Sequence, residues 1–160
     1  MKKTLLAVAL CLGLAAPAMG EVNLIGGVAG GYTFDGPAHG TKVFSTVAGT
    51  QIKKFSESTK LYTLARYLGN EEDQSWWGGK AVLVNQVHGL PWLSTVIDAG
   101  ALDGAFSNAD GTTTTSLTAG AGLMAQIGDN SGVLVYLEAI KRSKEWDMMI
   151  HFAPVWGVSF

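Results

Sequence analysis

The sequence predicts an all-β fold, an eight-stranded antiparallel up-and-down β-barrel that crosses a membrane. Apolar residues recur at every second position in eight segments, which is the period of a β-strand. Most segments exceed the roughly 5–6 residues of an ordinary strand and match the roughly 9–11 residues of a tilted strand in a bilayer. Charged residues make up only 15% of the chain, against about 25% in a soluble domain. Because lipid offers no water to satisfy backbone groups, strands can cross it only as a closed barrel.

The first twenty residues have the pattern of a secretory signal peptide. Two lysines precede an apolar run over residues 5–16, and the small residues Ala18 and Gly20 predict cleavage after Gly20. Cys11 follows a leucine, which is too large for a lipoprotein cleavage site. The predicted domains are therefore a signal peptide at 1–20 and a transmembrane β-barrel domain at 21–160, with no cysteine in the mature chain.

The period-2 pattern places the strands one after another along the mature chain. In the first, the even-numbered residues from Leu24 to Phe34 form one face, and in the second those from Phe44 to Ile52 do so. The third, fourth, fifth and seventh are apolar runs of the same period between turn residues. The sixth alternates most regularly. The predicted strands cover residues 22–34, 42–54, 60–68, 80–87, 92–105, 115–127, 133–141 and 148–160.

The predicted connections alternate in length and charge. The longer or more charged ones are 36–40, 69–79, 107–114 and 143–147, and the short ones are 56–59, 88–91 and 128–132. Short periplasmic turns that alternate with longer outer loops are typical of outer-membrane barrels. On this topology 13 of the 15 aromatic residues lie near one of the two membrane surfaces, the level that Trp and Tyr prefer.

The charge balance disfavours a nucleic acid partner. Without the two lysines of the signal peptide, nine basic residues face 13 acidic ones, which gives a net charge of −4. No basic patch is then available to neutralise phosphates. The three histidines are scattered without the spacing of metal ligands, so the sequence predicts no metal and no other cofactor.

The last eleven residues carry the most specific signal. Apolar residues alternate through Phe152, Trp156 and Val158 to the terminal Phe160. This pattern resembles the C-terminal signature of bacterial outer-membrane proteins, and eight strands in about 140 mature residues look like the small OmpA/OmpX-type barrels. The resemblance implies a Gram-negative outer membrane, export across the inner membrane with periplasmic chaperones, and recognition of these four residues by the barrel assembly machinery.

Pro154 departs from this signature. Proline has no N–H to donate to a neighbouring strand, and a closed barrel has no free edge to hide it. The sequence therefore predicts a bulge or a poorly closed seam at the last strand.

The faces opposite the apolar ones define a candidate lumen cluster: Arg66, Asp98, Gln126 and Glu138, with Lys53, Gln86 and His151 as further members. One interpretation is a polar, porin-like lumen that conducts or binds a small solute. The favoured one is a plug, because an eight-stranded barrel is just wide enough for side chains to fill. Charges inside a plug must pair, which predicts that Arg66 pairs with Glu138 or with Asp98.

A second candidate site is an acidic and aromatic segment that is expected in an outer loop: Glu71, Glu72, Asp73, Trp76 and Trp77. It would contact a surface partner, or cations that bridge lipopolysaccharide. The alternative is a solvated loop with an interface anchor.

The sequence thus favours a non-enzymatic outer-membrane barrel with a structural, surface-interaction or minor permeability role, embedded in outer-membrane lipid and lipopolysaccharide. Two alternatives remain. One is a soluble periplasmic or secreted β-barrel that binds a small apolar ligand. The other is an outer-membrane lipid hydrolase, although no nucleophile, base and acid are visible together.

Overall fold

A computed structural model describes residues 24–71, 75–103, 115–142 and 145–157. The predicted signal peptide, Glu72, Asp73, Val158 and Phe160 lie outside these residues. Across the described ranges, no helix is long and apolar enough to cross a membrane.

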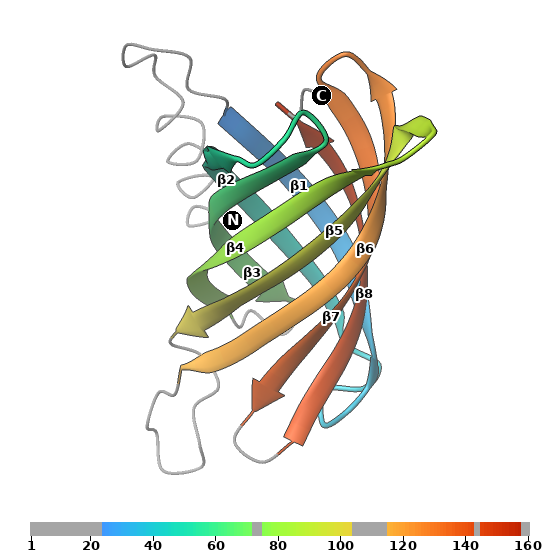
Figure 1. Ribbon diagram of the computed structural model, residues 1–160. Coiled ribbons are helices and arrows are strands. Elements are labelled where there is room, and N and C mark those ends of the chain that lie inside the picture. Colours follow the sequence, from blue (N-terminus) through green and yellow to red (C-terminus); the bar gives the residue numbers. More distant parts are fainter. Residues whose placement is uncertain (1–23, 72–74, 104–114, 143–144, 158–160) are drawn as a thin grey trace.

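Eight strands form one closed antiparallel barrel in sequence order, with β8 pairing back onto β1 (Figure 1). This confirms the predicted fold class. The strands are β1 (Leu24–Asp35), β2 (Lys42–Lys54), β3 (Thr59–Asn70), β4 (Ser75–Val87), β5 (Leu90–Asp103), β6 (Ser116–Gly128), β7 (Ser131–Arg142) and β8 (Glu145–Trp156).

The two ends of the barrel differ in their connections. At one end, where β1 begins and β8 ends (top of Figure 1), the strands are joined by residues 55–58, 88–89 and 129–130. We call this the turn end. The opposite end, the loop end, carries the connections 36–41, 71–74, 104–115 and 143–144. Strand order and connections together give the simple up-and-down topology.

Alternate residues of the strands point outward and form an apolar exterior. In β6, for example, Leu117 and Leu123 are 59% and 52% exposed, whereas the residues that follow them, Thr118 and Met124, are each 4% exposed. Large apolar side chains are likewise exposed on all the other strands except β3: Val28, Tyr32, Phe34, Phe44, Ile52, Trp77, Ile97, Val133, Val135, Leu137, Trp146, Phe152 and Trp156. A soluble barrel would cover its exterior with polar groups, so this surface opposes the soluble alternative.

The fourth strand begins earlier than the sequence predicted. Residues 75–79 belong to β4 and pair with β3 and β5, so the loop expected over 69–79 shortens to 71–74. Trp76 and Trp77 are therefore strand residues, and placing them in an outer loop was wrong. Trp76 is 2% exposed and points into the barrel, whereas Trp77 is 48% exposed and points outward.

The two glycines at 78 and 79 look like loop residues in the sequence, but Gly78 serves the strand pairing. A Cβ at position 78 would lie 1.9 Å from the Ala101 carbonyl oxygen of β5. Only glycine permits this close approach of the two backbones. The strand therefore continues where local composition predicted a break.

The seam between β1 and β8 is interrupted at Pro154. The register pairs run through Gly26↔Trp156 and Gly27↔Val155 and resume at Gly30↔Phe152. No residue is inserted there, and the register shift in this ladder lies further on, between Thr33 and Asp35. Of the two outcomes expected at Pro154, the structure thus has a locally unpaired seam and no bulge.

Candidate functional site in the barrel lumen

A polar belt crosses the lumen between the two ends. It consists of Arg66 on β3, Lys80 on β4, Asp98 on β5, Tyr136 and Glu138 on β7, and His151 on β8. All are inward positions of their strands. The belt joins strands that are not neighbours in the barrel wall.

Arg66 and Glu138 form the central pair of the belt. The guanidinium donates two parallel hydrogen bonds, Nη1 to Oε1 and Nη2 to Oε2, the latter 2.6 Å long. The side chains are 3% and 0% exposed. His151 Nε2 lies 3.0 Å from Glu138 Oε2. A two-pronged contact of this kind is the strongest form of ion pair and compensates both charges for the loss of water.

Lys80 and Asp98 form a second pair beside it. Lys80 Nζ lies 2.9 Å from Asp98 Oδ2 and 3.3 Å from the Tyr136 hydroxyl, which itself donates to Asp98 Oδ2. The ammonium also lies 4.5 Å from the centre of the Tyr136 ring. Lys80 and Asp98 therefore neutralise each other, as Arg66 and Glu138 do.

Two apolar clusters close the lumen on either side of the belt. The turn-end cluster contains Ile25, Tyr62, Leu64, Val82, Val84, Val96, Met124, Ala153 and Val155. The loop-end cluster contains Val43, Leu68, Trp76, Leu102, Ile140 and Met149. On β3, three successive inward residues show this layering. Leu64 belongs to the turn-end cluster, Arg66 to the belt and Leu68 to the loop-end cluster. The ion pairs are thus sealed between two layers of hydrocarbon.

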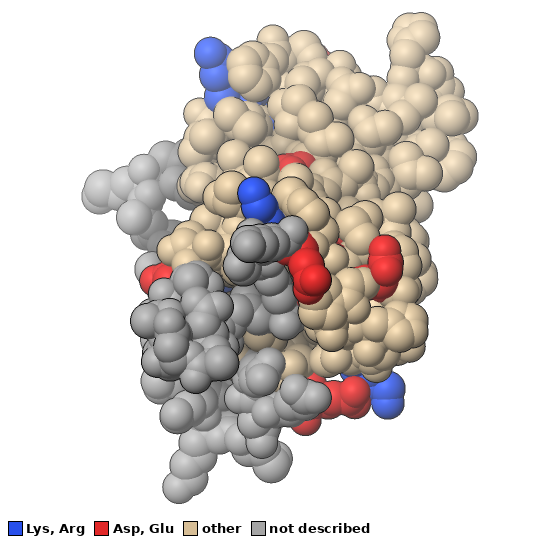
Figure 2. All heavy atoms as spheres, turned by 90° about the horizontal axis from the view of Figure 1, so that it is seen from below, with Lys and Arg blue, Asp and Glu red and all other residues tan. Residues whose placement is uncertain are grey.

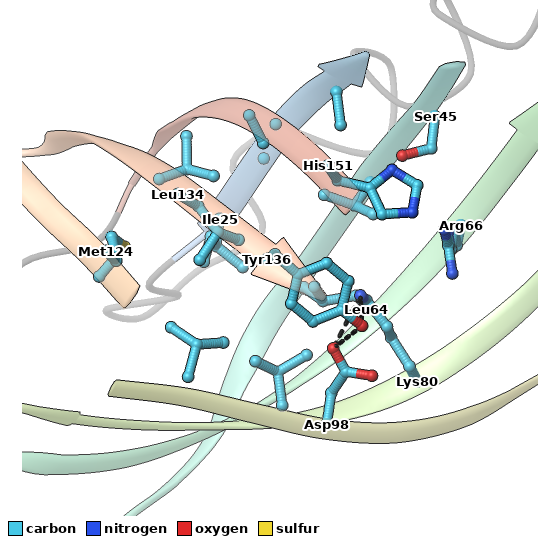
Figure 3. Close-up of a pocket in the computed structure, with 18 of the residues that line it drawn as sticks. Ile25, Ser45, Leu64, Arg66, Lys80, Asp98, Met124, Leu134, Tyr136 and His151 are labelled. Atoms are coloured by element: carbon cyan, nitrogen blue, oxygen red, sulfur yellow. Dashed lines mark hydrogen bonds and ion pairs between the residues drawn. The ribbon is translucent and has the colours of Figure 1, made fainter. Parts of the chain in front are cut away.

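A small cavity separates the belt from the turn-end cluster (Figure 3). Its volume is about 60 Å³, room for a few water-sized groups. Arg66, Lys80, Asp98, Tyr136 and His151 face it from the polar side. Three buried atoms of this wall have no hydrogen-bond partner within the described chain: Arg66 Nε, Asp98 Oδ1 and His151 Nδ1.

The structure brings together three of the four residues of the predicted lumen cluster. Arg66, Asp98 and Glu138 lie in the belt, but Gln126 does not join them. Its amide donates to the carbonyls of Gly128 and Asp129 at the turn end.

The further lumen candidates also separate. His151 lies in the belt, whereas Gln86 donates to the Pro91 carbonyl and Lys53 lies over the Phe55 ring, both near the turn end. Lys54, the last residue of β2, donates a 2.6 Å hydrogen bond to Glu57 in the 55–58 turn, which lowers the pKa of that carboxyl.

The sequence analysis missed Lys80 and Tyr136. Lys80 shares an alternation with Val82 and Val84, which face inward, while Ala81 lies on the outer face. This alternation is visible in the sequence, but the predicted strand began at Lys80. Lys80 therefore had no inward-facing residue before it in the predicted strand. Tyr136 is one of the two aromatic residues that the predicted topology leaves near the middle of a strand, and the sequence analysis did not assign it to the lumen.

Of the predicted outer-loop site, only Glu71 is described at the loop end itself. Its Oε1 accepts a 3.4 Å hydrogen bond from the Lys42 backbone N–H, and its Oε2 lies 3.8 Å from Lys42 Nζ. A view onto this end shows acidic and basic side chains interspersed (Figure 2). No field of a single sign is visible on this face among the described residues.

The histidines lie in unrelated places. His39 is in the 36–41 loop, where its Nδ1 lies 2.7 Å from the Phe34 carbonyl oxygen, and His88 is exposed in the 88–89 turn. Within the described part of the chain, no group of three or more His, Cys, Asp or Glu side chains could hold a metal ion. Only His151 stands beside a carboxylate in the lumen.

Comparison with known proteins places the fold. No family model matches the chain, and neither does any curated protein. A de novo designed transmembrane β-barrel aligns with 21% identity over 86% of this chain and 98% of its own, with a TM-score of 0.53. The N-terminal β-barrel domain of Pseudomonas aeruginosa OprF aligns with 15% identity over 83% and 96%, with a TM-score of 0.54. The chain therefore has the fold of the small eight-stranded transmembrane barrels, which confirms the OmpA/OmpX-type resemblance at the level of fold.

Proposed function

We propose that the protein is a non-enzymatic outer-membrane barrel with a closed lumen, whose role is structural or is exerted through its surface. The observation that carries this proposal is the layering of the lumen. A charge-compensated belt lies between two apolar clusters, inside a wall whose exterior is apolar. Such a molecule suits lipid on the outside and offers no continuous aqueous path inside.

The orientation follows from the connections. The turn end faces the periplasm and the loop end faces outward, since short periplasmic turns and longer outer loops are the rule for such barrels. Residues 1–20 direct export, and periplasmic chaperones deliver the chain. The assembly machinery reads Phe152, Trp156, Val158 and Phe160 in the last strand. Phe152 and Trp156, 55% and 46% exposed, point to the outside, where such a partner could contact them.

The layering argues against a permeability role. A solute that crossed the lumen would have to displace Tyr62 and Leu64 at one level and Leu68 and Trp76 at another, all at most 6% exposed. Between these levels it would have to separate Arg66 from Glu138. Breaking a buried ion pair costs about 3–5 kcal/mol, so steady conduction is not expected.

Fractionation tests the membrane assignment. The protein should be recovered with the outer membrane, require detergent for extraction, and migrate differently on a gel before and after heating. Recovery as a detergent-independent monomer from the periplasm would overturn the proposal in favour of the soluble alternative.

Planar bilayer recording tests the closed lumen. The refolded wild-type barrel should show no steady current, with an empty detergent blank as the control. A stable, large conductance from the purified barrel would contradict the plug and restore the permeability role.

A further inference from the structure

The interrupted seam and the lumen cavity lie at the same place. The cavity is lined by five consecutive residues of β1, from Ile25 to Ala29, and by Ala153 and Val155 of β8. The unpaired register positions are Val28 and Ala29 on β1, opposite Pro154 and Ala153 on β8. The backbone of β1 itself is thus the cavity wall where its pairing to β8 is missing.

The inward residues of β1 are small there, and at Gly27 the side chains of Val155 and Val47 from the neighbouring strands cover the wall. Gly27 and Ala29 point into the lumen with almost no bulk, and Ala153 faces them from β8. On the outside, a Cβ at Gly30 would meet no atom within 4 Å, so no neighbouring atom covers the outer face of β1 at this position. The wall between this surface and the cavity is one layer of backbone, which lacks the hydrogen bond that an N–H at position 154 would supply.

The exterior around the interruption belongs to the lipid-facing surface. Val28 is 44% exposed and Phe152 is 55% exposed, on the two sides of the seam. Val28 and Ala29 are the fifth and sixth of the twelve residues of β1. That is the middle of the strand, the level at which the chain ends of lipids meet in a hydrocarbon core about 30 Å thick.

The inner wall of the cavity is hydrocarbon on the side away from the belt. Val82, Val84, Val96, Met124 and Leu134 line it. Burying an apolar group among them is favourable when the group comes from water, but a group that arrives from lipid gains only packing contacts. An occupant from the bilayer would therefore exchange rapidly.

We propose that the lumen cavity takes up the terminal end of a lipid acyl chain, which passes sideways between β1 and β8 at Val28 and Pro154. The inference rests on the proposed membrane location. The small volume admits only the last few carbons of a chain, and the polar belt stops it from advancing toward the loop end. Pro154 keeps the seam unpaired because it has no N–H to contribute to the ladder.

Methyl NMR in lipid nanodiscs tests this directly. The barrel is prepared with protonated methyl groups in a deuterated background, in dimyristoylphosphatidylcholine. Cross-relaxation peaks are expected between the terminal methyl of the lipid and the methyls of Val84, Val96 and Met124 in the lumen. The loop-end cluster supplies an internal control, since Leu68 and Ile140 lie beyond the belt and should show no such peaks.

Two variants test separately whether uptake of the chain end requires the cavity and whether it requires the interrupted seam. Ala29→Leu fills the cavity from β1 and should abolish the lumen peaks, whereas the matched Ala139→Leu, on the outer face of β7, should leave them intact. Pro154→Val supplies the missing N–H, which can donate to the Val28 carbonyl, so the lumen peaks should weaken while the backbone N–H introduced at position 154 is protected from hydrogen exchange. Lumen peaks that survive both Ala29→Leu and Pro154→Val would overturn the lateral route.

Methyl groups on the barrel exterior separate the uptake of a lipid chain end from the membrane location on which it rests. Val135 and Leu137 point outward and must show peaks to the lipid chain if the barrel sits in the bilayer at all. Exterior peaks without lumen peaks in the wild type would overturn the uptake of a chain end and leave the membrane assignment standing. Loss of the exterior peaks would overturn the membrane assignment itself.

Discussion

Arg66 on β3 and Glu138 on β7 meet across the lumen through two parallel hydrogen bonds, with almost no exposure to solvent. The two strands are separated by β4, β5 and β6 in the barrel wall. The contact therefore ties opposite walls together. Among the belt contacts of the described residues, this one joins the strands that lie furthest apart in the barrel wall, so the pair is the natural point at which to perturb the belt.

Removing one partner of this pair should destabilise the barrel strongly. Glu138→Gln leaves the Arg66 guanidinium buried without its counter-charge, which costs about 3–5 kcal/mol. The midpoint of urea unfolding in lipid vesicles, followed by tryptophan fluorescence, should fall accordingly. Glu57→Gln in the exposed 55–58 turn is the matched control and should leave the midpoint unchanged. An unshifted midpoint for Glu138→Gln would show that the pair is not formed.

Removing both partners should be less harmful than removing one. In Arg66→Leu/Glu138→Leu the belt loses its central charges together, and apolar replacement of a buried pair is often neutral or stabilising. The double variant should therefore recover most of the stability that either single variant loses, with a coupling energy of about 0.5–3 kcal/mol. Strictly additive losses in the same urea assay would contradict a direct interaction between the two side chains.

The sequence predicts part of the belt. Alternation alone places Arg66, Asp98 and Glu138 on inward faces, and the need to neutralise buried charge predicts that Arg66 has an acidic partner. The choice of Glu138 over Asp98 could not be predicted, because it depends on how strand tilt brings β3 and β7 to one level across the lumen. Lys80, which pairs with Asp98, was missed because Gly78 and Gly79 were assigned to a loop and the predicted strand began only at Lys80, whereas β4 begins at Ser75.

The Tyr136 hydroxyl gives a milder test of the belt. Tyr136→Phe removes the hydrogen bonds to Asp98 and Lys80 but keeps the ring under the Lys80 ammonium. Leaving a buried carboxylate oxygen short of a donor should cost about 1–3 kcal/mol. The barrel should still fold and show its heat-dependent gel shift. Full wild-type stability in the variant would mean that the hydroxyl contributes nothing to the Lys80 and Asp98 pair.

Neighbouring glycines in β4 should respond differently to the same added methyl group. Gly78→Ala places a Cβ 1.9 Å from the Ala101 carbonyl oxygen, so β4 and β5 must move apart. Overpacking of this kind costs about 1–3 kcal/mol. Gly79→Ala meets its nearest atom at 3.4 Å, and should shift the urea midpoint little. Equal effects at both positions would refute the close backbone approach at Gly78.

A charge on the outer face tests whether that face meets lipid. Leu137 is 48% exposed near the middle of β7, whereas Ile127 is 73% exposed near the turn end. In a bilayer Leu137→Arg should cost about 2–4 kcal/mol and Ile127→Arg about 0–1 kcal/mol, because the penalty falls from the midplane to the interface. On a soluble barrel both residues face water, and arginine at either position would be tolerated alike. The urea midpoints of the two variants in vesicles should therefore differ if the barrel lies in lipid. Equal midpoints would place Leu137 in water.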